Sequence, residues 1–361
     1  MAPSLPRTMR AVTWTAPPTA LYSTIETSIE YTASAALPPS SKSLPPDSAL
    51  IKVAYATINP VDYKLPEVAL YRILNYSLPN QSSTPLIPAG DYSGTVIEFT
   101  IHGIVTGDKV FGRSDPPYFG ALAENVVIRG GRNNVVKVPE GVQMRDACTI
   151  GVAGLTALQC LETMSGKRVL INGASGGTGT FGVQIAKALG WEDVVGTCST
   201  RNVGFVEGLG ADGVVDYRTE DLVTELKRRG WEYGEFDLMI DNVDSPEIFW
   251  GSEGFLRRGG KYVTIAGNVS LAFGMRLGQM LYLPKWLGGI EAAASFLRRR
   301  SDGDGFARIA DWIAEGKVKP VIAREYKLEE AREAFLALKS GRVRGKLVIK
   351  VSGEENNIER N

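Results

Sequence analysis

The spacing of apolar residues along the chain changes near Glu140. Before it, short runs of alternating apolar and polar residues, such as Ala49–Ala56 and Tyr92–Glu98, are separated by turn residues such as Pro45–Asp47. Alternation with a period of two is typical of strands that bury one face, and Pro, Gly and Asp favour the turns between them. The pattern predicts a mostly β domain over residues 1–139.

After Glu140, apolar runs of strand length alternate with segments of helical period. This alternation is typical of βαβ units in a doubly wound parallel sheet, so residues 140–304 are predicted to form an α/β domain. The last segment, 305–361, is predicted to return to the first domain. The predicted strands of the parallel sheet are Val169–Ile171, Val194–Thr197, Gly213–Tyr217, Phe236–Val243 and Lys261–Ile265.

One turn of the second domain is rich in glycine. The strand Val169–Ile171 leads into the turn 172–179, which is followed by a helix and by a second strand that ends at Cys198. Backbone N–H groups of such a turn, together with the N-terminus of its helix, bind the pyrophosphate of a dinucleotide. The predicted contacts with that cofactor are Ser175, Gly176, Gly177, Thr178 and Gly179.

The end of the second strand bears on which dinucleotide binds. NAD-binding units place an Asp or Glu there to hold the ribose 2′-hydroxyl. This chain has Ser199, Thr200 and Arg201 instead, and two hydroxyls and a guanidinium suit a 2′-phosphate. We therefore expect these three residues to bind NADPH. The alternative is that Ser199 caps the next helix and that Arg201 is solvated.

Composition narrows the classes of partner and compartment. The 40 basic and 40 acidic residues balance, which argues against nucleic acid or an anionic membrane as a partner. Three cysteines without paired spacing, and a start at Met1–Met9 that lacks the apolar core of a signal peptide, predict a reduced, cytoplasmic protein. The apolar segment Leu271–Leu297 contains charged residues and a proline, so we expect a mobile cap or a subunit contact and no membrane span.

Several motifs follow one another along nearly the whole chain. They are Ile58–Lys64, Ala89–Val96, Gly107–Gly112, Gly120–Glu124, Val152–Ala157, the glycine-rich turn, Leu209–Asp212, Val215–Arg218 and Gly341–Ile349. In these motifs the chain resembles the zinc-free branch of the medium-chain dehydrogenase/reductase family, the quinone oxidoreductases and enoyl reductases. Within that branch it is most similar to fungal trans-acting enoyl reductases of polyketide pathways.

The resemblance implies an α/β architecture of two domains. A GroES-like, mostly β catalytic domain, residues 1–139 and 305–361, would be interrupted by a Rossmann NADP-binding domain with a doubly wound parallel sheet, residues 140–304. The active site and cofactor would lie in the cleft between these domains. Family members are commonly dimers or tetramers, so the resemblance implies an oligomer, with a homodimer as one expectation.

The chain departs from the zinc-dependent relatives at the positions that would bind the metal. Those enzymes build an open tetrahedral site from a Cys and a His of the first domain. Here the first region is Asn59–Tyr63, and the second has Gly90–Tyr92 where Gly-His-Glu would be expected. The single histidine, His102, lies in a predicted turn, and the four-cysteine structural lobe is absent. We predict no metal.

Without a metal, hydride addition to a polarised C=C bond or a quinone is easier than alcohol oxidation. The resemblance places Asn59–Lys64 beside the nicotinamide, with Val61 and Asp62 among the cofactor contacts and Tyr63 or Lys64 near the substrate carbonyl or the cofactor.

Tyr71 is the third catalytic candidate, because some relatives use a tyrosine beyond this motif as proton donor. The alternative is a tyrosine that packs on a helix with Leu70 and Leu74.

The resemblance adds cofactor contacts in other segments. Thr156 would contact the nicotinamide end, although tight helix packing is an equal alternative. Tyr217 would lie near the adenosine unless it is a core residue. Open sheets bind ligands at the carboxyl ends of their strands, so residues at the end of the fifth strand are expected to face the nicotinamide. A C-terminal segment that includes Lys346 resembles one that lies near the cofactor in relatives. The further contacts are Thr156, Tyr217, Thr264, Ile265, Val343 and Arg344.

These features together predict a metal-free, NADPH-dependent reductase of activated C=C bonds, an enoyl reductase in a fungal biosynthetic pathway. Its substrate would be a small hydrophobic enone, a quinone or an enoyl group on a carrier protein, with a polyketide synthase as a partner. The loops Leu65–Leu86 and Val269–Gly303, with Tyr76, Phe273, Tyr282 and Trp286, are expected to frame the substrate entrance. A quinone or enone oxidoreductase and a non-catalytic NADPH-binding scaffold are the alternatives.

Overall fold

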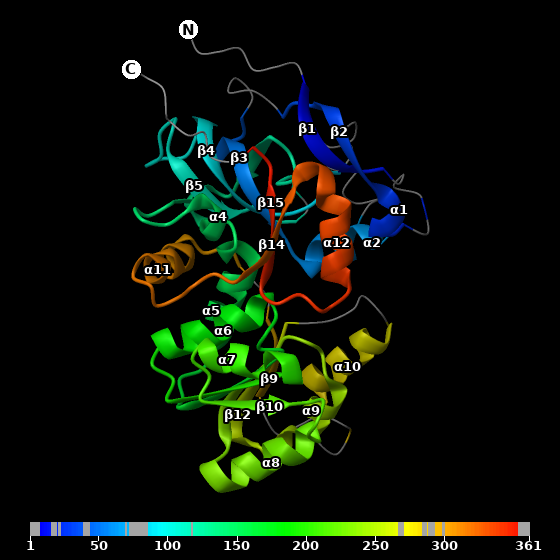
Figure 1. Cartoon of the computed structure of the whole chain (residues 1–361), viewed down its shortest axis with the longest axis vertical. Helices are drawn as coiled ribbons and strands as arrows, with labels where there is room; N and C mark the ends of the chain where they lie inside the picture. The colour runs from blue at the N-terminus through cyan, green and yellow to red at the C-terminus, as the bar shows by residue number, and fades with distance from the viewer. Residues whose placement is uncertain are drawn as a thin grey trace. The chain divides into compact units, whose positions relative to one another are not determined.

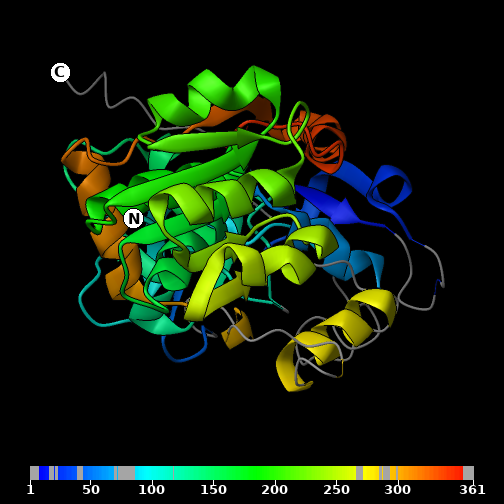
Figure 2. The same ribbon diagram turned by 90° about the horizontal axis from the view of Figure 1, so that it is seen from below.

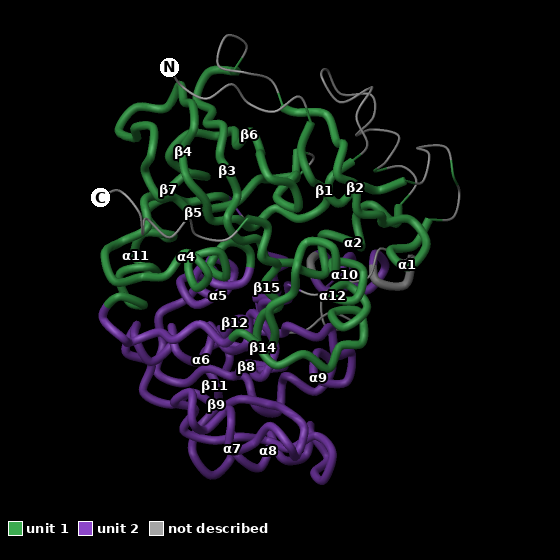
Figure 3. The backbone as a smooth tube through the Cα atoms, turned by 45° about the horizontal axis from the view of Figure 1, so that its top comes forward, with its two compact units in different colours: residues 1–152, 301–314, 322–361 green, residues 153–300, 315–321 purple. Residues whose placement is uncertain are grey.

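The computed structural model describes residues 8–15, 20, 23–38, 44–68, 71, 86–116, 118–265, 271–283, 287, 293–297 and 300–352. The chain divides into two compact units (Figure 3). Unit 1 comprises residues 1–152, 301–314 and 322–361, and unit 2 comprises residues 153–300 and 315–321. The predicted domain limits were placed where the spacing of apolar residues changes. They stay a prediction.

Unit 1 is built on a seven-stranded sheet (Figure 1). Its order is β14-β15-β3-β4-β5-β7, with β6 paired to β3. A separate antiparallel pair, β1 and β2, carries the N-terminal part of the chain. The strands are β1 (Thr8–Trp14), β2 (Ile29–Ala36), β3 (Ser48–Ile58), β4 (Asp91–Phe99), β5 (Lys109–Arg113), β6 (Asn125–Arg129), β7 (Val135–Lys137), β14 (Ile322–Lys327) and β15 (Lys346–Lys350).

The C-terminal strand returns to the first sheet, as the sequence predicted. β15 pairs antiparallel with β3 and parallel with β14, so residues from the two ends of the chain share one core. That core includes Trp14, Ile51, Val96 and Phe335, all buried. The helices of unit 1 are α1 (Ile25–Ser28), α2 (Pro60–Glu67), α4 (Met144–Ala147), α11 (Gly303–Ala314) and α12 (Ala331–Lys339).

Unit 2 contains a six-stranded sheet whose paired strands are all parallel. The order β10-β9-β8-β11-β12-β13 reverses direction between β8 and β11, which defines a doubly wound sheet. The strands are β8 (Arg168–Asn172), β9 (Asp193–Cys198), β10 (Gly213–Asp216), β11 (Phe236–Asp241), β12 (Leu256–Thr264) and β13 (Ala293–Phe296). The first five confirm the predicted α/β fold, although β12 begins earlier than expected.

Helices cover both faces of this sheet, with α6 on one side and α8 on the other (Figures 1 and 2). The helices are α5 (Leu155–Leu161), α6 (Gly177–Ala188), α7 (Val203–Gly208), α8 (Leu222–Tyr233), α9 (Pro246–Gly251) and α10 (Leu271–Tyr282). The segment that was expected to be a cap or a subunit contact therefore holds a helix and the sixth strand. None of the helices in the described part of the chain has the length and apolar character needed to cross a membrane.

Candidate functional site

The glycine-rich turn between β8 and α6 is shaped by close backbone contacts. Gly173 has φ +74°, a conformation that side chains disfavour. A Cβ added to Gly179 would lie 2.2 Å from the Gly173 carbonyl oxygen and 2.6 Å from the Ala174 Cα, so only glycine fits there. α6 begins at Gly177, and its N-cap Gly176 supplies no side-chain hydrogen bond. The turn therefore presents its backbone to a ligand, as a pyrophosphate site requires.

The predicted residues of the turn and of the end of β9 lie together. Thr197 accepts the Gly173 N–H at 3.1 Å through its hydroxyl, and its carbonyl accepts the Ala174 N–H at 2.9 Å. One residue that the sequence did not indicate joins the two segments directly. The Asn202 side-chain amide donates to the Ser175 hydroxyl at 3.1 Å and to the Ser199 hydroxyl at 3.2 Å.

Charge at this edge of the sheet is mixed. Thr200 and Arg201 are exposed, and the strand β10 ends beside them at Asp216. The pKa of the Asp216 carboxyl is lowered, first because the Thr200 hydroxyl donates to it and further because it accepts from the Arg218 N–H and the Thr219 hydroxyl. These neutral donors keep the carboxylate ionised, so one negative charge lies beside Thr200 at this edge.

Tyr217 follows Asp216 and is 46% exposed, which excludes the alternative of a core tyrosine. The Arg218 guanidinium lies 5.6 Å from the centroid of its ring. An exposed ring beside the end of β9 is free to stack on a planar ligand.

The strands β8, β11 and β12 end at the same edge of the sheet. Their last residues, Asn172, Asp241 and Thr264, are neighbours in the pairing register. The Asp241 carboxylate organises the loop that follows β11: it accepts three backbone N–H groups from Val243–Ser245, the Asn172 amide and the Tyr262 hydroxyl. Ile265 then donates its N–H to the Asp241 carbonyl at 3.1 Å. Thr264 and Ile265 thus lie where the sequence predicted, at the carboxyl end of the sheet.

Three buried polar atoms of unit 2 have no hydrogen-bond partner among the described residues, and one of them, the Nη1 of Arg168, lies at the start of β8. The other two are the hydroxyl of Thr156 on α5 and the side-chain oxygen of Asn242, which follows β11. A buried polar group without a partner costs free energy, which a bound ligand with matching groups would recover. Together with the glycine cradle, these atoms fit a polar cofactor held by unit 2.

In unit 1 the predicted segment Asn59–Lys64 begins α2. The Asn59 N–H donates to the Asp62 carboxylate at 2.6 Å, and Pro60 occupies the first turn of the helix. This is a capping box, so Asp62, which is 0% exposed, has a structural partner in the motif itself. Val61 and Lys64 are half-buried on the same helix.

A buried ion pair holds the start of α2 in place. The Asp91 carboxylate of β4 accepts the Asn59 amide at 2.8 Å, the Thr57 hydroxyl at 3.1 Å and the Val152 N–H at 2.9 Å. The Lys346 ammonium of β15 lies 3.8 Å from the same carboxylate and donates to the Asn59 side-chain oxygen. Asp91 is 0% and Lys346 4% exposed.

The three catalytic candidates occupy different surroundings. Tyr63 is buried, and the Lys339 ammonium lies 5.7 Å from its ring centroid while bonded to Glu26 and Glu67. Burial raises the pKa of Tyr63. Tyr71 is half-buried and packs against the core of unit 1, whereas Leu70 and Leu74 of the alternative lie outside the described residues. Lys64 is half-buried.

Two further sets of predicted residues differ in exposure. Val343 packs against the core of unit 1, and Arg344 is exposed. Of the residues expected to frame the substrate entrance, Tyr282 is exposed, whereas Tyr76, Trp286 and the side chain of Phe273 lie outside the described residues.

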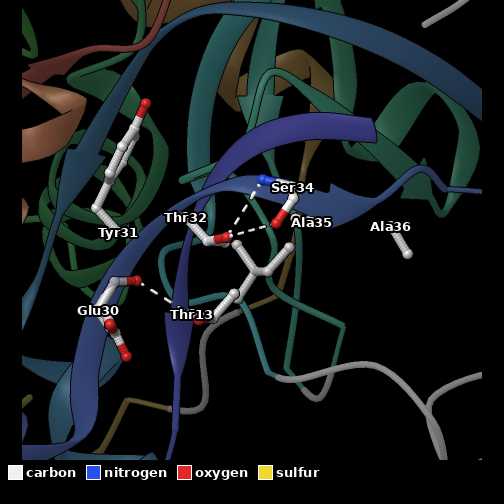
Figure 4. A pocket seen from close by; sticks show the side chains of 8 residues that line it. Thr13, Glu30, Tyr31, Thr32, Ser34, Ala35 and Ala36 are labelled. Atoms are coloured by element: carbon white, nitrogen blue, oxygen red, sulfur yellow. Dashed lines mark hydrogen bonds between the residues drawn. The ribbon is translucent and has the colours of Figure 1, made fainter. Parts of the chain in front are cut away.

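A separate cavity of about 340 Å³ lies beside β2 (Figure 4). Its polar groups bond to one another: the Thr32 hydroxyl contacts Ser34, and the Thr13 hydroxyl donates to the Glu30 carbonyl. None of the predicted site residues lines it.

The residues at the metal-binding positions of zinc enzymes do not fit a metal. No group of three or more His, Cys, Asp or Glu in the described ranges has the arrangement to hold an ion. His102 is exposed, and the three cysteines are buried and form no disulfide. At the second position of the zinc motif, Asp91 is bonded to protein donors.

Comparison with known proteins gives matches over nearly the whole chain. Residues 45–197 match the alcohol dehydrogenase GroES-like domain, and residues 209–349 match the zinc-binding dehydrogenase family. The trans-enoyl reductase pgmF of Aspergillus terreus is 34% identical over 97% of this chain and 98% of its own length. The bovine mitochondrial NAD(P)H oxidoreductase RTN4IP1 is 31% identical over 85% of this chain and 82% of its own. The structure of the quinone oxidoreductase from Coxiella burnetii superimposes with a TM-score of 0.76 at 26% identity, covering 95% of this chain and 99% of the other.

Proposed function

The chain belongs to the medium-chain dehydrogenase/reductase family and is an oxidoreductase, and we propose that it reduces activated C=C bonds with NADPH and without a metal. The observation that carries this proposal is the edge of the unit 2 sheet. There the glycine-rich turn opens toward Ser199–Arg201, and the end of β9 lacks the carboxylate that would bind an NAD ribose.

NADPH is favoured by the donors at this edge. Ser199, Thr200 and Arg201 offer hydroxyls and a guanidinium, which bind a phosphate through charge-assisted hydrogen bonds. Asp216 lies nearby, but its carboxylate already accepts from Thr200, Thr219 and a backbone N–H. In this proposal Arg201 provides the positive charge that distinguishes NADPH from NADH.

The remaining cofactor contacts follow from their positions. We assign Ser175, Gly176, Gly177, Thr178 and Gly179 to the pyrophosphate, Tyr217 to the adenosine, and Thr156, Thr264 and Ile265 to the nicotinamide end. The unpartnered Thr156 hydroxyl supports this assignment, since a nicotinamide carboxamide would supply its missing partner. From unit 1, the proposal adds Val61, Asp62, Val343 and Arg344.

When bound, NADPH supplies a hydride to the electron-poor carbon of the substrate, which leaves negative charge on a carbonyl or quinone oxygen. The chain must stabilise that charge and deliver a proton. Lys64 and Tyr71 are our candidates for these roles, because each is half-buried. Tyr63 stays a third candidate, although its contact with Lys339 already gives it a packing role. The variants Lys64→Gln and Tyr71→Phe separate the first two candidates. The variant that removes the true donor should have reduced turnover and an unchanged affinity for NADPH.

As to substrate, we propose an enoyl group, presented free or on the carrier domain of a polyketide synthase in a fungal biosynthetic pathway. The 34% identity with a trans-enoyl reductase over almost the full length of both chains supports this choice. A quinone oxidoreductase is the second candidate, supported by the 26% identity with the Coxiella enzyme. A cytoplasmic homodimer is part of the proposal.

The test is a kinetic comparison of substrate classes. Purified protein is mixed with NADPH and an enoyl thioester, a free enone or a quinone, and oxidation is followed by absorbance of the reduced nicotinamide. Turnover that is highest with the enoyl thioester supports the proposal, whereas turnover that is highest with quinones favours the second candidate. NADPH binding without turnover on any class would favour a non-catalytic scaffold. Gly179→Val is the control, since a side chain there should abolish binding.

A further inference from the structure

We propose that Asn202 is a positioning residue for the cofactor: its amide orients the hydroxyls of Ser175 and Ser199 so that both donate to phosphate oxygens. The inference rests on the proposed binding of NADPH by unit 2. The juxtaposition is direct, because the Asn202 Nδ2 lies 3.1 Å from one hydroxyl oxygen and 3.2 Å from the other. Asn202 itself is 6% exposed.

The direction of these hydrogen bonds decides what the serines can do. A hydroxyl has one proton to donate and two lone pairs that accept. Since the Asn202 NH₂ group is a donor to both oxygens, neither serine needs its own proton for the contact. Among the described residues, neither hydroxyl donates to another group. The hydroxyl protons of Ser175 and Ser199, one on each side of the buried Asn202 amide, are therefore available to donate to a ligand.

The position of Asn202 in its own helix supports a role beyond local structure. It is the N-cap of α7, where an Asn side chain normally accepts a backbone N–H of the first turn. Here the side chain makes no such cap. Its amide instead contacts Ser175, which lies 27 positions earlier in the chain, as well as Ser199. The contacts with both serines use the donor Nδ2 of this side chain, and they link the start of α7 to the glycine-rich turn.

The two serines lie where phosphates are expected. Ser175 belongs to the glycine-rich turn at the start of α6, and Ser199 directly follows the last residue of β9. The third hydroxyl of this edge, on Thr200, already donates to the Asp216 carboxylate. Asp216 therefore accepts the hydroxyl proton of Thr200, whereas the contacts with Asn202 leave the hydroxyl protons of Ser175 and Ser199 able to donate to an anion.

Asn202→Asp tests the direction of the bonds. The carboxylate has nearly the shape of the amide but only accepts, so both serines would turn their protons toward it and offer lone pairs to the ligand. We expect the Kd for NADPH, measured by titration of protein fluorescence, to rise about 50-fold, as for the loss of charge-assisted hydrogen bonds. Asn133→Asp, which changes an exposed residue of unit 1 by the same charge, is the matched control and should leave the Kd unchanged.

Asn202→Ala tests whether the effect passes through the serines. In the wild-type background it should raise the Kd for NADPH about fivefold, and less for NADH, which lacks the 2′-phosphate. In the Ser175→Ala/Ser199→Ala background it should have no further effect, because the hydroxyls it orients are gone. A merely structural role would weaken binding equally in both backgrounds.

Two outcomes would overturn the inference. One is an unchanged Kd for NADPH in Asn202→Asp, which would mean that the serines donate to residue 202. The other is an Asn202→Ala effect that is equal with and without the serines. If the wild-type protein binds neither NADPH nor NADH, the proposed function itself fails, and that failure is visible before any variant is made.

Discussion

The candidate segments of the two units are held by opposite means. In unit 1 the start of α2 is fixed by buried charged side chains, Asp91 and Lys346, which meet at Asn59. In unit 2 the glycine-rich turn is fixed by backbone contacts so close that no side chain fits at Gly179. The side chains that link this turn to the end of β9 are neutral, the hydroxyls and amide around Asn202.

The difference follows from what each segment must present. A backbone-built turn leaves its N–H groups exposed to an anion, and it needs no charge of its own because the helix N-terminus favours negative groups. A buried ion pair fixes a segment without exposing it, but both ions must stay paired, since either alone would be buried without compensation. The two segments should therefore respond differently to substitution.

The largest effect is expected when the buried pair of unit 1 is broken. Lys346→Met removes the ammonium and leaves the Asp91 carboxylate, which is 0% exposed, without its cation. We expect the free energy of unfolding in urea to fall by about 3–5 kcal/mol.

The double variant Lys346→Met/Asp91→Asn is the control for this loss. With both charges removed, no ion is left uncompensated, so much of the lost stability should return. A single variant as stable as the wild type, or a double variant less stable than the single one, would contradict the view that paired charge holds α2.

A smaller loss is expected from the turn of unit 2. Gly179→Ala places a methyl group 2.2 Å from the Gly173 carbonyl oxygen, and the backbone must shift. Overpacking of this kind costs about 1–3 kcal/mol of unfolding free energy, and NADPH binding should be lost with it.

Gly204→Ala is the matched control within the same unit. No atom lies within 4 Å of an added Cβ at Gly204, which belongs to α7, so alanine should raise the free energy of unfolding by about 0.4–1 kcal/mol. If both glycines tolerate alanine equally, the turn is not held by backbone contact.

The third prediction tests the charge that unit 2 offers to the ligand. Arg201 is exposed, so its contribution to a phosphate contact is screened by solvent. Arg201→Ala should raise the Kd for NADPH about tenfold, or 1.4 kcal/mol, and should leave the Kd for NADH within about twofold. The effect should shrink as salt is added. Equal weakening of both cofactors would remove Arg201 from the 2′-phosphate.

The contrast between the units also explains what the sequence could and could not predict. Glycines and alternating apolar and polar residues are local signals. The turn 172–179 and five of the six strands of the unit 2 sheet were therefore predicted from neighbouring residues alone. The sixth strand, Ala293–Phe296, was missed because four residues in an apolar segment give no clear period.

Side-chain networks were missed for a different reason. Asn202 contacts Ser175 across 27 residues, and Lys346 contacts Asn59 across 287, so neither pairing has a local pattern. Asp62 was expected at the cofactor, and its capping box with Asn59 has a signal in the sequence, an Asn followed three residues later by an acid.

The smallest effect is expected where charge acts at the surface of unit 2. Glu225 of α8 bonds Arg228 and Arg229, and the Arg228 guanidinium foremost lowers the pKa of Glu225 to about 2. Because this value is below the unfolded pKa near 4.5, the stabilisation is complete above that pH and is lost as the pH falls toward about 2. Glu225→Gln should lower the free energy of unfolding by about 0.5–1 kcal/mol at neutral pH and should flatten its fall over that pH interval.

Urea titrations at several pH values measure this free energy, with Glu207→Gln on α7 as the control. A loss in Glu225→Gln as large as that in Lys346→Met would show that surface charge holds unit 2 as firmly as buried charge holds unit 1, and the contrast between the units would fail.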